Sequence, residues 1–92
     1  MLQQEIETKR MLLAGREAYA EGLRLIYRLE KGEGFWIVAS CGEERASFEV
    51  GSDLGLAWEL FCAVVDGTVT PCVLDEICSD WLSGKSTVPL NS

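Results

Sequence analysis

The sequence predicts an α+β fold, in which an antiparallel β-meander is followed by a C-terminal αα-hairpin that packs on one face of the sheet. Three observations predict it. Apolar and polar residues alternate over 23–30 and 45–50, whereas from position 53 onward apolar residues recur at helical spacing. The third is length, because 92 residues suffice for one domain whose two layers must bury their apolar sides against each other.

The middle of the chain is predicted to form three consecutive strands. Residues 23–30 alternate with a period of two, and a glycine-containing loop at 31–34 leads into an aromatic and β-branched run at 35–41. A second turn at Gly42 precedes the alternating strand at 45–50. Strands joined by such short connections pair antiparallel.

The alternation also predicts a register for the first hairpin, because a one-residue slip would turn the apolar side chains to the wrong face. Leu29 is expected opposite Phe35. On the other face, the same register brings Arg28 opposite Trp36, where the guanidinium can lie along the indole ring.

The first predicted helix covers about 53–66. Asp53 is a suitable N-cap residue, and Gly67 supplies a stop signal. The helix is apolar over much of its circumference, which predicts that it is largely buried.

The second predicted helix covers about 71–83. Thr70 is the expected N-cap, Pro71 occupies the first position, where its missing N–H costs nothing, and Gly84 is the expected end. Residues 1–84 are thus predicted to form a single α+β domain. The tail, 85–92, has no pattern and is expected to be flexible.

The first 22 residues allow two predictions. Residues 3–14 are rich in helix formers, whereas the segment TKRMLLAG reads equally well as a strand that turns at Gly15. Composition does not separate these alternatives.

The segment TVTPCVLDEICSDWL, after a helix and a strand-rich first half, resembles an uncharacterised domain-of-unknown-function family of short clostridial proteins. That resemblance implies that TKRMLLAG is a strand at about 8–14, which gives about four strands in all. Trp58, Trp81 and four cysteines depart from the family pattern, and no activity or site residue comes with the resemblance. The matching positions are Thr68, Val69, Thr70, Pro71, Leu74, Ile77, Asp80 and Leu82.

Charge and composition disfavour several classes of protein. A net charge of -7 repels nucleic acid and anionic membranes. No stretch resembles a signal peptide or a membrane span, so a cytoplasmic location is predicted. In that compartment, cysteines are expected as free thiols, and the absence of histidine and of a Cys-x-x-Cys motif predicts no metal site and no cofactor. The four cysteines are Cys41, Cys62, Cys72 and Cys78.

No catalytic activity is predicted, and the reactivity of one cysteine stays open. Without histidine, no catalytic pair stands out, so the protein is predicted not to be an enzyme. Cys72 is a candidate reactive thiol because a helix N-terminus lowers a thiol pKa. As an alternative function, Tyr27, Trp58 and Trp81 would line a small-ligand or catalytic cleft between the hairpin and the sheet.

The candidate interface lies on the face of the meander away from the helices and consists of Ile26, Arg28, Trp36 and Val38. Apolar patches rimmed by polar groups mark interaction sites, and tryptophan with arginine is typical of binding hot spots. The sequence therefore predicts a protein-interaction or regulatory module, including a homodimer through this face. Cover by the N-terminal segment and no role at all remain open alternatives.

Overall fold

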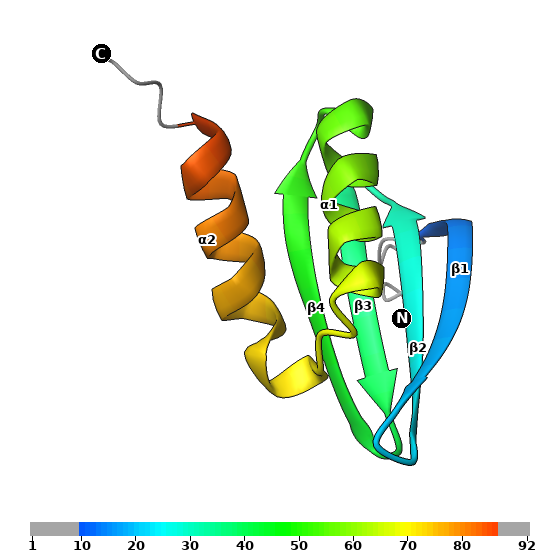
Figure 1. The fold of residues 1–92 in the computed structure, drawn as a ribbon. Coiled ribbons are helices and arrows are strands. Elements are labelled where there is room, and N and C mark those ends of the chain that lie inside the picture. Colours follow the sequence, from blue (N-terminus) through cyan, green and yellow to red (C-terminus); the bar gives the residue numbers. More distant parts are fainter. Residues whose placement is uncertain (1–9, 87–92) are drawn as a thin grey trace, which may run out of the picture.

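A computed structural model describes residues 10–86 of the chain. Four antiparallel strands lie in the order β1-β2-β3-β4 and are followed by two helices, of which α1 lies across one face of the sheet and α2 lies alongside β4 (Figure 1). The predicted α+β fold class is confirmed. The elements are β1 (Met11–Ala20), β2 (Leu23–Lys31), β3 (Phe35–Cys41), β4 (Glu44–Gly51), α1 (Leu54–Asp66), the 3₁₀ turn η2 (Pro71–Val73) and α2 (Leu74–Ser86).

The first strand is longer than the one predicted at 8–14, of which residues 8 and 9 lie outside the described residues. β1 runs straight through Gly15, which pairs with Arg28 instead of forming a turn. The turn comes at Glu21 and Gly22, whose φ angles of 54° and 82° are the two positive values that a type I′ hairpin turn requires. This turn allows β1 to continue to Ala20.

Both later hairpins have shorter loops than the sequence suggested. β2 continues to Lys31, which pairs with Phe35, so that Arg28 lies opposite Val38 and not opposite Trp36. The β3–β4 connection is a two-residue turn that starts with glycine at a positive φ of 63°, as in a type II′ turn. The predicted partners are therefore wrong by two residues. The predicted faces are right because an even shift leaves every side chain on its face.

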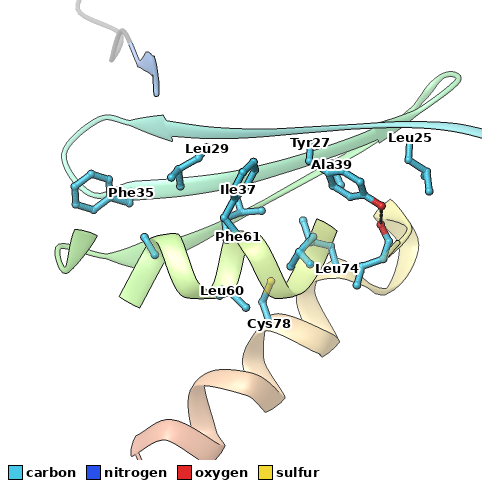
Figure 2. Close-up of a cluster of buried hydrophobic side chains, with 13 residues drawn as sticks. Leu25, Tyr27, Leu29, Phe35, Ile37, Ala39, Leu60, Phe61, Leu74 and Cys78 are labelled. Carbon is cyan, nitrogen blue, oxygen red and sulfur yellow. Dashed lines mark hydrogen bonds between the residues drawn. The ribbon is translucent and has the colours of Figure 1, made fainter. Parts of the chain in front are cut away.

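The core lies between the sheet and the helices (Figure 2). Tyr27 is fully buried within it, and its hydroxyl donates a hydrogen bond of 2.9 Å to the carbonyl oxygen of Val69, in the loop after α1. This bond ties the sheet to the connection between the helices. The buried cluster comprises Leu25, Tyr27, Leu29, Phe35, Ile37, Ala39, Ala57, Leu60, Phe61, Val64, Val69, Leu74 and Cys78.

The start of α1 is as predicted, since the Asp53 carboxylate accepts a hydrogen bond of 3.1 Å from the Leu56 amide. The helix also ends at Asp66, as predicted, but the left-handed residue that follows it is one position later than Gly67. Val69 N–H bonds the carbonyl of Val64 and Thr68 N–H that of Val65, which is a Schellman motif with Thr68, not Gly67, in the left-handed position, at φ 47°.

Thr68→Gly should raise the free energy of unfolding by about 0.5–1 kcal/mol, because a left-handed conformation strains an L-residue by more than glycine loses in the unfolded chain. For a domain of this size, that gain is about 3–6 °C in melting temperature, measurable by circular dichroism. Thr68→Ala is the control and should gain less, because it keeps a Cβ atom. A Thr68→Gly melting temperature at or below that of the wild type would contradict this assignment.

The second helix begins as 3₁₀ and ends later than predicted. Pro71 does occupy the first position, but the Thr70 side chain makes no capping hydrogen bond and instead lies 3.4 Å from the Cys72 sulfur. Gly84 does not end α2, which continues to Ser86, because a glycine inside a helix costs only about 1 kcal/mol. Most of the predicted tail, from residue 87 onward, lies outside the described residues. Within residues 10–86, no helix has the length and apolarity needed to cross a membrane.

Candidate functional site

The sheet face turned away from α1, here called the outer face, carries all four residues of the predicted interface. The register places Arg28 opposite Val38 and Glu30 opposite Trp36, on the side away from Tyr27 and the core. The side chains assigned to this face by strand pairing are Leu12, Glu17, Tyr19, Arg24, Ile26, Arg28, Glu30, Trp36, Val38, Ser40, Arg45, Ser47 and Glu49.

An arginine does lie over Trp36, but it is Arg10 and not the predicted Arg28. The Arg10 guanidinium is 4.3 Å from the centre of the indole ring and its Nε is 3.5 Å from Glu30 Oε1. Arg28 Nε donates to the other carboxylate oxygen of Glu30 at 2.9 Å. Glu30 is only 5% exposed, so this carboxylate joins two guanidinium groups at a desolvated site, where such pairing is needed.

The apolar part of this surface is smaller than the sequence suggested. Val38 is only 1% exposed and Trp36 is half-buried beneath Arg10. Ile26 is also half-buried, and Arg28 is exposed. The prediction of an exposed apolar patch is therefore wrong for Val38, and it holds only in part for Ile26 and Trp36. Besides the charged groups, a partner can reach Ile26, the rim of Trp36, and the side chains of Leu12 and Tyr19, which are 53% and 67% exposed.

Two hollows adjoin one another on the outer face and share Ile26 and Arg28 in their walls. The first, of about 380 Å³, extends from Ile26 toward β1, where Gly15 leaves space between longer side chains. The second, of about 320 Å³, extends toward the β3–β4 turn and Arg45, with Val38 in its wall. Together they form a trough across the sheet with apolar, arginine and glutamate side chains in its walls, the glutamates being Glu17, Glu43 and Glu44.

The outer face is the most basic part of an acidic chain. Its arginines, Arg10, Arg24, Arg28 and Arg45, are half of the eight basic residues in the sequence. Arg24 is ion-paired with Glu17. Arg45, by contrast, is exposed and has no carboxylate within ion-pair distance in the part of the chain that the structure describes.

Sequence reasoning missed several members of this surface. Glu30 follows Arg28 by two residues in an alternating strand, and the rule that such residues share a face would have paired them. Arg10 precedes the strand and carries no periodic signal. Its place over Trp36 follows from where β1 begins.

The four cysteines are free thiols in different environments. Burial, together with the nearby charge of Asp75, raises the pKa of Cys78 to about 12, so this thiol is protonated at neutral pH and serves as core. Cys72 is exposed beside the Thr70 hydroxyl and lines a third hollow, of about 380 Å³, with Arg45. Whether Cys72 is reactive stays a prediction.

The alternative cleft between hairpin and sheet is not formed by the residues proposed for it. Tyr27 is fully buried and bonded to the Val69 carbonyl. Trp58 stands on the β1 side of α1, with the Arg16 guanidinium 5.8 Å from its ring centre, whereas Trp81 belongs to α2, beside β4. The two tryptophans thus lie at opposite edges of the sheet.

Within residues 10–86, no group of three or more cysteine, aspartate or glutamate side chains is arranged to hold a metal ion. Comparisons with models of protein families, with curated proteins and with solved structures found no match. The resemblance of the helical hairpin to the clostridial family therefore stays a prediction.

Proposed function

We propose that the domain is a non-enzymatic protein-interaction or regulatory module that binds its partner through the outer-face trough. The observation that carries the proposal is the trough itself, in which Ile26 provides an apolar wall beside the exposed Arg28, and the exposed Arg45 lies across β3 from Ile26. Arginine beside apolar side chains is typical of binding hot spots.

Charge complementarity indicates the kind of partner. Arg24 and Arg28 already pair with glutamates of the same chain, whereas Arg45 has a guanidinium available beside the second hollow. A partner segment with an apolar side chain for the wall at Ile26 and a carboxylate for Arg45 fits both features.

The non-enzymatic part of the proposal is supported by side-chain chemistry. The chain has no histidine to act as a general base. Cys78, with a pKa of about 12, supplies no thiolate at neutral pH. Within the described part of the chain, neither hollow of the trough is lined by a cysteine, lysine or histidine, and the polar residues around the second hollow are arginines, glutamates and Ser40.

A peptide-display selection against the folded domain tests this proposal. Enriched peptides should combine an apolar residue with a carboxylate, and Arg45→Glu should weaken their binding at least tenfold through like-charge repulsion. Glu76→Lys, an exposed change on α2, is the matched charge-reversal control and should leave binding unchanged. Selected peptides that bind the Arg45→Glu variant as well as the wild type would refute the proposed site.

Self-association through the same face is the alternative that the sequence analysis raised. It requires a second outer face to pack over Trp36, so Trp36→Glu should dissolve a dimer seen by light scattering. A wild-type monomer at high micromolar concentration would exclude it and leave a different partner for the trough.

A further inference from the structure

The two edge strands of the sheet differ in how well they are covered. β4 is flanked by α2 and η2, whereas β1 packs against β2 and α1 and has no described element beside its outer edge (Figure 1). β1 is ten residues long, and an edge strand of that length presents a row of backbone N–H and C=O groups that another strand can pair with.

The turn identifies which backbone groups are available. In a two-residue hairpin the closing pair, here Ala20 and Leu23, is hydrogen-bonded, and bonded pairs then alternate along the strand. The N–H and C=O groups of Tyr19, Glu17 and Gly15 therefore point away from β2. A bulge between Leu12 and Ala14 ends the regular stretch on its other side.

We infer that β1 pairs antiparallel with β1 of a second copy of this chain, about a two-fold axis, so that the two four-stranded sheets become one continuous sheet. The side chains along the edge are compatible with such a pairing in one register. Any symmetric register places one residue opposite itself, and centring it on Arg16 or Glu17 would set like charges face to face.

Centring the register on Ala18 avoids that conflict. Ala18 then faces its own copy, and Glu17 faces Tyr19 of the second copy in a hydrogen-bonded pair. The Tyr19 hydroxyl already lies 3.4 Å from the Glu17 carboxylate within one chain, so the two side chains are suited to the same contact between strands. Arg16 would face the small Ala20 of the other copy.

Exposed apolar groups flank this edge on both sides. Tyr19 is 67% exposed on the outer face, and Trp58 is 41% exposed on the helix side, where the Arg16 guanidinium draws it toward β1. Leu54, one helical turn earlier, is exposed as well. A two-fold axis at β1 brings Tyr19 of both copies to the seam on the outer face, and Trp58 and Leu54 of both copies to the seam on the helix side, which would shield these groups from water.

The same features limit growth to a dimer. Because α2 and η2 flank the β4 edge, the joined sheet has no second open edge on which to continue. An interface of a few backbone bonds and three apolar groups per copy is at the small end of known interfaces, so a dissociation constant in the micromolar range is expected.

Sedimentation over a concentration series tests the inference. The wild type should dimerise, and Tyr19→Pro should weaken the dimer about 10- to 100-fold, because it removes an outward N–H without breaking a bond to β2. Tyr19→Thr keeps the N–H and is the matched control, expected to dimerise more strongly than Tyr19→Pro. The inference would be overturned if the Tyr19→Pro variant melted at the wild-type temperature and dimerised as strongly as the wild type. A monomeric wild type would overturn it as well.

Cross-linking tests the axis. In a Cys72→Ser background, Ala18→Cys should form an intermolecular disulfide on mild oxidation, because position 18 lies opposite itself. Arg45→Cys, on β4, is the control and should not cross-link. A dimer that cross-links at Arg45→Cys and not at Ala18→Cys would overturn pairing through β1. The Trp36→Glu substitution distinguishes this dimer from a dimer through the outer face, because it should dissociate only the outer-face dimer.

Discussion

Leu74→Ala is expected to lower the free energy of unfolding by about 2–5 kcal/mol, through lost burial and the cavity left behind. Leu74 is fully buried at the start of α2 and faces the core below the sheet (Figure 2). A domain of this size has a total stability of only about 5–15 kcal/mol, so the variant should be substantially unfolded in mild denaturant. Urea unfolding followed by tryptophan fluorescence measures the loss.

Ile77→Ala is the matched control on the same helix. Isoleucine and leucine have the same number of carbon atoms, but Ile77 is 40% exposed, so its truncation should cost less than about 1 kcal/mol. The i, i+3 spacing of the two residues predicts one shared helix face, whereas the structure buries Leu74 and leaves Ile77 partly exposed. Equal losses for the two variants would contradict the observed orientation of α2.

The fold was largely predictable because its main signals are local. Alternation of apolar residues defined which face of β2 and β3 is buried, and helical spacing defined α1. Register was not predictable in the same way, because a shift of two residues leaves the alternation unchanged. Turn length sets the register, and the type I′ turn at Glu21 and Gly22 was the signal that would have ended β1 at Ala20.

Helix ends were harder for a related reason. Glycine at 67 and 84 is a tendency and not a requirement, since Thr68 takes the left-handed position after α1 and α2 runs through Gly84. In the first case, the hydrogen bonds of the Schellman motif and the buried side chain of Val69 hold the strained residue in place. Tertiary contacts of that kind leave no periodic trace in a sequence.

The candidate site was predictable in location but not in exposure. Strand alternation correctly assigned Trp36 and Val38 to the outer face. How much of each remains accessible depends on longer side chains around them, such as Arg10, which precedes β1 and reaches Trp36. The consequence is functional, because the accessible chemistry shifts from an apolar island to a trough where Ile26 lies between arginines.

Tyr27→Phe should lower the free energy of unfolding by about 1–3 kcal/mol, although it removes a single oxygen atom. The hydroxyl donates a hydrogen bond to the carbonyl of Val69, a residue that is only 9% exposed. The substitution would leave this carbonyl without that partner. Tyr19→Phe is the matched control, because the Tyr19 side chain is exposed and its hydroxyl has only a long contact to Glu17, so its loss should stay within about 0.5 kcal/mol. Chemical denaturation of the three proteins compares them.

The pH dependence of the same variant identifies the cause. Burial raises the pKa of Tyr27, so above the unfolded value of about 10 the unfolded chain releases this proton while the folded chain retains it. The contribution of Tyr27 to stability is therefore complete below that pH and declines as the pH rises further. Cys78, whose pKa is also raised, adds a decline from about pH 9 in both proteins, so the difference between wild type and Tyr27→Phe isolates the tyrosine. A difference that stays constant from pH 8 to 11 would show that the hydroxyl is not buried in the folded protein.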